Sequence, residues 1–342
     1  MKGKGRVIII AEAGVNHNGD LEKALQLIDE AASAGADYVK FQTFCSEELV
    51  SASAALADYQ KQNVTETNSQ LEMLKKLEIP IDWYPMLIRR CEERGIRFLS
   101  TGFDKESVEF LLKFSPDFIK VPSGEITNYD FLKFVGSCNK KVILSTGMST
   151  MVEVKMASKL LIEAGLRSTD LIVLHCHTEY PTAFSDVNLM AMKSIAEDLR
   201  VDIGYSDHTS GIEVAIAAVA LGACCIEKHF TLDKTLPGPD HKASLDPTEL
   251  TQMVIAIRNV SEAIDGTGLK EPSAVEIKNM VAARRSLFAR SNIRIGEIML
   301  KEKLVAQRPG SGISPMDWSQ IVGKKAKREI QKGEILKSED FE

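Results

Sequence analysis

Eight short apolar runs, each followed by a polar turn and usually an amphipathic stretch, dominate residues 1–266. Continuous apolar runs of this kind are typical of parallel strands that are buried on both faces of a sheet. Eight strand–helix repeats in a segment of this size predict a (β/α)8 TIM barrel, an α/β fold. A doubly wound open sheet is the alternative, because periodicity does not show closure. The expected strands are 7–13, 38–43, 97–101, 118–122, 142–146, 171–176, 201–205 and 224–230.

Helical periodicity fills most of the gaps between these runs. The expected helices are 21–34, 86–94, 107–114, 151–164, 214–221 and 247–264. Residues 63–79 do not fit the repeat. We expect them to form an inserted loop and a short helix after the second strand.

The pattern changes after residue 266. Residues 267–285 form a polar linker with a helical tendency, and residues 286–342 contain short strands punctuated by glycine and proline. This last segment repeats itself, since IRIGEI at 293–298 and IQKGEI at 330–335 are each followed, at the same spacing, by Leu304 and Phe341. We therefore expect a small, β-rich, pseudo-symmetric domain over 286–342.

The composition excludes several classes of protein. A net charge of −6 offers no general attraction to nucleic acid. No apolar stretch approaches the roughly 20 residues that cross a bilayer, and the run at 7–10 is too short for a signal peptide. The six cysteines contain no Cys-x-x-Cys pair, so we expect reduced thiols and a cytoplasmic protein.

Polar clusters follow all eight expected strands. In a barrel of this type, the carboxyl ends of the strands surround the active site. The clusters are 12–19, 40–43, 100–104, 120–125, 145–149, 175–181, 206–209 and 227–230, with 238–241 shortly after the last. Their register with the strands predicts an enzyme active site at that end of the barrel.

Lys40 and Lys120 stand near apolar strand ends, where an unpaired ammonium group is costly. With the hydroxyl groups of Ser123, Ser145 and Ser206, they suit a ligand that carries a phosphate and a carboxylate. The alternative is that each lysine pairs internally with one of the nearby carboxylates, Glu12, Glu125 or Glu227.

His208 and His229 fall at the ends of adjacent strands. One strand–helix repeat brings such positions within reach of one divalent metal, for which neutral imidazole is a suitable ligand. The competing histidines are His17, His175, His177 and His241. Glu125 could act as a general acid or base, and its alternatives are a helix N-cap or an ion pair with Lys120.

Six segments carry a family resemblance. They are IAEAGVNHNG at 10–19, VKFQ at 39–42, KVPSGE at 120–125, LSTGM at 144–148, GYSDHT at 204–209 and EKHFT at 227–231. In this order they resemble the bacterial sialic acid (nonulosonic acid) synthases, and residues 286–342 resemble the antifreeze-like (SAF) domain of that family. The resemblance spans essentially the whole chain.

The resemblance implies an enzyme that condenses phosphoenolpyruvate with an N-acetylated hexosamine and releases phosphate. The acceptor would be N-acetylmannosamine or 2,4-diacetamido-2,4,6-trideoxymannose, and the product N-acetylneuraminate or N,N'-diacetyllegionaminate. It also implies a divalent metal that polarises the acceptor aldehyde, with Mn²⁺ preferred over Mg²⁺ or Co²⁺.

The resemblance also implies roles for individual residues. Glu125 would be the acid or base, and His208 and His229 the metal ligands. The residues holding phosphoenolpyruvate would be Lys40, Thr101, Lys120, Ser123, Ser145 and Ser206. The acceptor would contact Glu12, Gln42, Tyr180 and Asp240. Arg308 resembles an arginine that reaches the partner's site, which implies a domain-swapped homodimer.

The chain departs from the family pattern at two positions. Gly102 stands where proline is usual, and Thr178 stands where neuraminate synthases carry asparagine. The resulting Thr-Glu-Tyr-Pro run resembles the branch that makes legionaminic acid. Two other functions remain open, a related phosphoenolpyruvate-dependent aldolase-type sugar-acid synthase and a non-catalytic sugar-binding protein. The SAF-like segment argues against the first, and the set Lys40, Glu125, His208 and His229 argues against the second.

Overall fold

The structure is a computed structural model that describes residues 6–51, 53–56, 63 and 69–342. The chain divides into two compact units, Met1–Gly266 and Thr267–Glu342. Each unit has its own buried apolar core.

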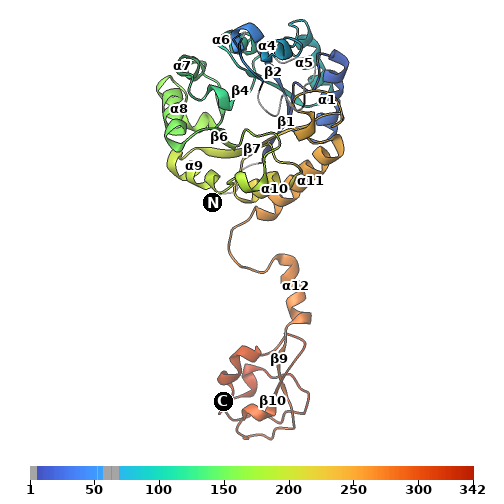
Figure 1. The fold of residues 1–342 in the computed structure, drawn as a ribbon. Coiled ribbons are helices and arrows are strands. Elements are labelled where there is room, and N and C mark those ends of the chain that lie inside the picture. The colour runs from blue at the N-terminus through green and yellow to red at the C-terminus, as the bar shows by residue number, and fades with distance from the viewer. Residues whose placement is uncertain (1–5, 52, 57–62, 64–68) are drawn as a thin grey trace. The chain divides into compact units, whose positions relative to one another are not determined.

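The first unit is a closed barrel of parallel strands, in which each strand pairs with the next and the eighth pairs with the first (Figure 1). This closure confirms the predicted barrel and excludes the open doubly wound sheet. The strands are β1 (Ile8–Gly14), β2 (Tyr38–Thr43), β3 (Arg97–Gly102), β4 (Phe118–Val121), β5 (Lys141–Ser145), β6 (Leu171–Cys176), β7 (Asp202–Asp207) and β8 (Cys225–His229).

Helices surround the barrel, and all six that periodicity predicts are present with ends shifted by a few residues. They are α1 (Leu21–Ser33), α5 (Trp83–Arg94), α6 (Lys105–Leu112), α8 (Met151–Glu163), α10 (Glu213–Ala220) and α11 (Pro247–Ile264). Periodicity did not single out α7 (Tyr129–Ser137) or α9 (Ala191–Leu199). Capping boxes, Thr150 with Glu153 and Asp246 with Glu249, fix where α8 and α11 begin.

The connection after β2 contains the short helices α2 (Ser46–Leu49) and α4 (Gln70–Lys75). The helix expected within 63–79 is therefore present, although part of that segment lies outside the described residues. Phe44, Met73 and Leu77 pack with Val15, which anchors the connection over the carboxyl ends of the strands.

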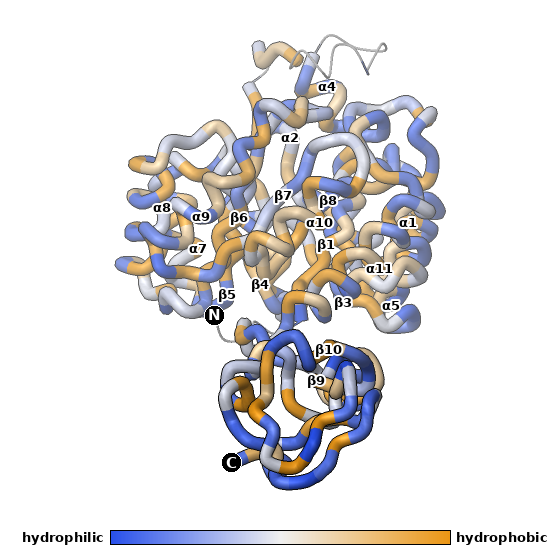
Figure 2. The backbone as a smooth tube through the Cα atoms, turned by 90° about the horizontal axis from the view of Figure 1, so that it is seen from below, coloured by the Kyte–Doolittle hydropathy of each residue, from blue (hydrophilic) through white to orange (hydrophobic). Residues whose placement is uncertain are grey.

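The strands alternate between two environments along their length, because successive side chains point to opposite faces. One set, including Ile9, Val39 and Ile226, packs against the helices. The other points into the barrel, where Ile10, Leu99, Phe118, Ile143 and Leu174 form an apolar layer. Most of the strands are hydrophobic, whereas hydrophobic and hydrophilic residues alternate along the outer helices (Figure 2).

The second unit contains α12 (Ala274–Ala283) and the antiparallel pair β9 (Ser286–Ala289) and β10 (Leu304–Gln307). Ile293 and Ile330 exchange backbone hydrogen bonds of 2.9 and 3.0 Å, so the two sequence repeats pair with each other. Each repeat also closes its turn with a glutamate, Glu297 or Glu334, that accepts a backbone N–H. The predicted pseudo-symmetric module is confirmed. Within the described residues, no helix is both long enough and apolar enough to cross a membrane.

Candidate active site

A pocket of about 520 Å³ lies at the carboxyl ends of the barrel strands. Thirteen of the fourteen predicted site residues line it: Glu12, Lys40, Gln42, Thr101, Lys120, Ser123, Glu125, Ser145, Tyr180, Ser206, His208, His229 and Asp240. The fourteenth, Arg308, belongs to the second unit, where its side chain is exposed. Residues from every strand or the loop after it therefore meet in one cavity.

Strand alternation explains why these side chains converge. In most of the strands, the last inward apolar side chain is followed two residues later by an inward polar residue or a cysteine. Glu12 follows Ile10, Ser145 follows Ile143, and Cys176 follows Leu174 in this way. A polar layer thus rests directly on the apolar layer and forms the floor of the pocket.

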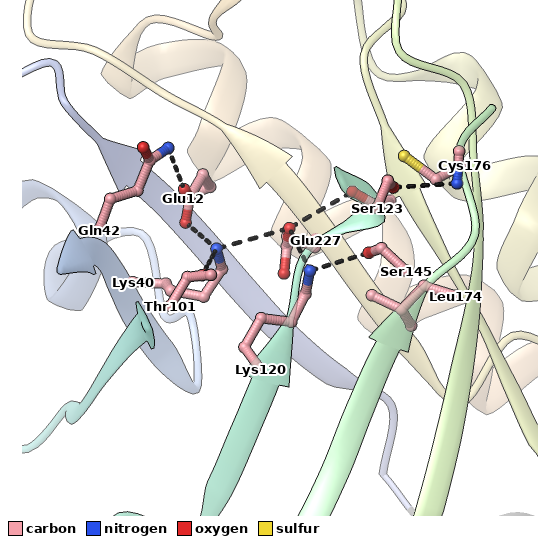
Figure 3. A network of polar contacts seen from close by, with 12 residues as sticks. Glu12, Lys40, Gln42, Thr101, Lys120, Ser123, Ser145, Leu174, Cys176 and Glu227 are labelled. Atoms are coloured by element: carbon pink, nitrogen blue, oxygen red, sulfur yellow. Dashed lines mark hydrogen bonds and ion pairs between the residues drawn. The ribbon is translucent and has the colours of Figure 1, made fainter. Parts of the chain in front are cut away.

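Two lysines and two glutamates form the centre of this floor, and none of the four is more than 5% exposed. Lys40 Nζ lies 2.6 Å from Glu12 Oε2 and 3.6 Å from Glu227 Oε1, while Lys120 Nζ lies 3.6 Å from the same Glu227 oxygen (Figure 3). The lysines therefore have the internal partners that were left open as an alternative, namely Glu12 and Glu227 rather than Glu125. Glu227 is shared by both lysines, whereas Glu12 contacts one.

Each lysine also donates to a hydroxyl group. Lys40 Nζ lies 2.9 Å from Thr101 Oγ1, and Lys120 Nζ lies 2.8 Å from Ser145 Oγ. Ser206 Oγ donates to Glu227 Oε1 at 3.4 Å. Of the hydroxyl groups predicted to bind an anion, those of Thr101 and Ser145 therefore contact the ammonium groups, and that of Ser206 contacts their shared carboxylate. The hydroxyl group of Ser123 instead accepts a 2.9 Å hydrogen bond from the N–H of Gly147.

The two glutamates differ in acidity. Burial, opposed by Lys40, raises the pKa of Glu12 to about 7. Burial acts in the same direction on Glu227, but Lys120 and Lys40 outweigh it and hold the pKa of Glu227 below its ordinary value. Glu227 is therefore the permanent counter-charge of the lysines, and Glu12 is the carboxyl group that is readily protonated.

His208 and His229 face the same space, with ring centroids 5.4 Å apart. His208 Nδ1 contacts the carbonyl oxygen of His177, which can only accept, so in the neutral ring Nε2 carries the lone pair. His229 Nδ1 is buried, has no hydrogen-bond partner among the described residues, and lies 3.9 Å from Asp240 Oδ2. Burial, then His208 and Lys40, hold the pKa of His229 well below its ordinary value, so its imidazole is neutral.

This pair suits a divalent metal, because His229 is neutral with an unused buried nitrogen and the contact of His208 Nδ1 with His177 leaves Nε2 of His208 for a metal. Burial, outweighed by Cys176, leaves the pKa of His208 above its ordinary value, so a metal would displace a proton there. No group of three or more His, Cys, Asp or Glu side chains within the described ranges could hold a metal. Three of the competing histidines make hydrogen bonds to the protein: His175 to Val187, His177 to Thr182, and His241 to Thr231 and Asn18. The fourth, His17, also accepts a hydrogen bond, from the N–H of Gly19 to Nδ1. Its Nε2 is buried without a partner among the described residues, but His17 does not line the pocket.

Glu125 ends a single 3-10 turn, Ser123–Glu125, at the rim of the pocket. Its carboxylate accepts a 2.7 Å hydrogen bond from Asn128, and Asn128 itself caps α7. Both alternatives for Glu125, an N-cap and an ion pair with Lys120, are therefore wrong. The side chain is partly exposed and can reach a ligand in the cavity.

Some lining residues were not among the predicted site residues. The sequence suggested Glu227 only as a possible partner of Lys40 or Lys120. Because Glu227 lies two residues before His229 in β8, its side chain points into the barrel on the same face. Cys176 is placed in the same way by Leu174. One further side of the pocket comes from the connection after β2. The described residues of this connection that line it are Phe44, Leu49, Val50, Met73, Leu74 and Leu77 with one polar residue, Gln70.

Comparison with known proteins gives the family. The model of the NeuB family matches residues 27–270, and that of the SAF domain matches residues 284–342. This chain belongs to the NeuB family. It is an acid synthase of the NeuB type.

Two relatives are named N,N'-diacetyllegionaminic acid synthase. The protein of Campylobacter jejuni is 46% identical over 97% of this chain and 99% of its own, and that of Legionella pneumophila is 44% identical over 98% and 94%. A solved N-acetylneuraminic acid synthetase from Leptospira borgpetersenii has 34% identity and a TM-score of 0.72, over 81% of this chain and 91% of its own.

Proposed function

We propose that this enzyme condenses phosphoenolpyruvate with 2,4-diacetamido-2,4,6-trideoxymannose and one water, giving N,N'-diacetyllegionaminate and phosphate. A bond forms between C3 of phosphoenolpyruvate and the aldehyde carbon, water adds at C2, and the C–O bond to phosphate breaks. The observation that carries the proposal is the convergence of Lys40, Lys120, His208 and His229 on one buried pocket. The names of the relatives at 46% and 44% identity support the product.

Phosphoenolpyruvate brings a phosphate and a carboxylate to the two lysines. Thr101, Ser145 and Ser206 are already oriented toward the same centre, and they would donate to these oxygens. Glu227 keeps its negative charge there. Glu12 would release Lys40 and take up a proton, because the pKa of its carboxyl group is about 7.

His208 and His229 would hold the divalent metal, Mn²⁺ before Mg²⁺ or Co²⁺, which when bound supplies a Lewis acid that polarises the acceptor aldehyde. Glu125, at the rim, would exchange a proton with the acceptor oxygen or with water. Gln42, Tyr180 and Asp240 line the same cavity and would orient the sugar.

The apolar side of the pocket supports a deoxygenated acceptor. Leu49, Val50 and Leu74 offer no partner to a hydroxyl or phosphate group, and burying such a group without a partner is costly. Lys40 and Lys120 are the lysine or arginine side chains that line the described part of the pocket, and both are already paired. A methyl group at C6 fits this side, whereas a 6-phosphate does not.

The test compares acceptors at fixed phosphoenolpyruvate and Mn²⁺. Phosphate release is measured with the trideoxyhexose, with N-acetylmannosamine, with N-acetylmannosamine 6-phosphate and without acceptor. We expect release to require an acceptor and kcat/KM to be highest for the trideoxyhexose. A higher kcat/KM for either N-acetylmannosamine compound would overturn the proposed acceptor, and no release with any acceptor would overturn the reaction.

We also propose that the enzyme is a domain-swapped homodimer in which Arg308 reaches the partner's pocket. Arg308 is exposed in the second unit, and the N–H of Gly310 donates to the carbonyl oxygen of Val281 in α12 at 2.7 Å, which ties the arginine's loop to the helix.

A further inference from the structure

A buried ion pair lies in the barrel wall beside the two histidines. Asp207 ends β7 and Lys228 lies in β8, and the two are direct partners in the parallel ladder. Lys228 Nζ is 2.7 Å from Asp207 Oδ2, and both side chains are 0% exposed. Because Asp207 precedes His208 and Lys228 precedes His229, strand alternation points this pair away from the pocket.

Thr209 closes the pair into a network. Its backbone N–H and its hydroxyl group both donate to Asp207 Oδ1, at 3.0 and 2.8 Å. Its carbonyl oxygen accepts a 2.7 Å hydrogen bond from Lys228 Nζ. Residues 207–209 therefore form a turn with His208 at its centre, and Lys228 fastens both ends of this turn to β8.

The network is not explained by stability alone. Removing two charges from water costs several kcal/mol per ion, and apolar residues of similar volume often stabilise a core equally well or better. The network does not line the pocket either, because the pocket lining does not include Asp207, Lys228 or Thr209. What the network provides is geometry, because it fixes the backbone of His208 relative to that of His229.

We propose that the Asp207–Thr209–Lys228 network is a positioning device that sets the spacing of His208 and His229 for a divalent metal. The inference rests on the metal site of the proposed function. Groups that orient metal ligands from behind typically change metal affinity by about 10- to 100-fold when they are removed. The 5.4 Å separation of the two rings is the quantity that the network holds constant.

The test measures Mn²⁺ binding to the substrate-free enzyme by titration calorimetry, alongside the dependence of turnover on Mn²⁺ concentration. Asp207→Asn combined with Lys228→Met removes the ion pair without leaving an unpaired charge. We expect the Kd for Mn²⁺ to rise at least about tenfold, while kcat at saturating Mn²⁺ stays within about threefold of wild type. Thr209→Val removes one hydrogen bond at nearly constant volume and should raise the Kd by about threefold.

The control is a second ion pair, Asp37 with Arg258, which lies 2.7 Å apart and involves the chain before β2 rather than the pocket. Asp37→Asn combined with Arg258→Met should lower Tm and leave the Kd for Mn²⁺ unchanged. His208→Ala should abolish Mn²⁺ binding. Suppose that His208→Ala abolishes Mn²⁺ binding. The positioning role is then wrong if the Kd for Mn²⁺ of both Asp207→Asn/Lys228→Met and Thr209→Val stays within twofold of the wild-type value. If His208→Ala and His229→Ala bind Mn²⁺ normally, the metal site itself is wrong.

Discussion

Glu125 differs from the other carboxylates of the pocket because it is partly exposed and has no lysine partner. Glu125→Gln preserves its shape and its contact with Asn128 but removes its ability to exchange a proton. We expect kcat to fall by about 10² to 10⁴ with little change in phosphoenolpyruvate affinity. Steady-state kinetics and equilibrium binding of phosphoenolpyruvate separate the two quantities. An unchanged kcat would make Glu125 structural, and lost affinity would place it among the binding residues.

The buried side chain of His17 makes the free energy of unfolding depend on pH. Its ring packs near Phe41 and Trp83, and burial lowers the pKa of His17 to about 4. The unfolded chain therefore binds a proton below about pH 6.5 that the folded chain refuses, so the free energy of unfolding falls as the pH falls toward 4. Between pH 7 and pH 5 this contribution is about 2 kcal/mol.

The measurement is urea unfolding of wild type and His17→Asn at pH 7 and pH 5. The variant should lose less stability between the two values, by about 2 kcal/mol. Glu12 acts in the opposite sense, because a raised carboxyl pKa lowers stability as the pH rises through 4.5 to 7, but it is present in both proteins and cancels. Equal losses in the two proteins would show that His17 is protonated when folded.

At the scale of the elements, the described part of the connection after β2 contributes the apolar side of the pocket. Leu74 in α4 lines the cavity, so Leu74→Lys introduces a cation there. We expect kcat/KM for N-acetylmannosamine 6-phosphate to rise by about tenfold or more and that for the trideoxyhexose to fall. Leu71→Lys is the control, because Leu71 lies in the same helix but does not line the pocket. Equal effects of the two substitutions would disprove a contact between Leu74 and the acceptor.

The elements could be predicted from the sequence to different degrees. The strands could be predicted, because β5 and β6 have apolar residues on both faces and end in polar clusters. Helices α7 and α9 were not singled out, although they are one residue longer than α6 and α10, which periodicity did predict. Most of the pocket followed from its position at the strand ends. The apolar side of the pocket could not be predicted from the sequence, because it depends on tertiary packing of Met73 and Leu77 against Phe44.

At the scale of the whole molecule, the second unit carries surfaces that its own core does not use. No residue of α12 is buried, and Val275, Ile277 and Val281 are each more than half exposed. Exposed apolar side chains that are close together in sequence favour contact with another protein surface. This observation supports the proposed homodimer, whose mass can be measured by light scattering.

The domain swap predicts complementation between two inactive variants. If Arg308 acts in its own subunit's pocket, Arg308→Ala and Glu125→Gln inactivate separate sites, and a mixed dimer has no intact one. If Arg308 acts in the partner's pocket, one of the two composite sites in the mixed dimer has both wild-type residues, so it should show about half of the wild-type kcat per dimer. Co-expression with two different affinity tags isolates the mixed dimer, and dimers of each single variant serve as controls. The acceptor dependence adds a second readout, because removing residues 286–342 should impair sugar use more than phosphoenolpyruvate binding, whose lysines both lie in the barrel. Mixed dimers as inactive as their parents would show that Arg308 does not act across the interface.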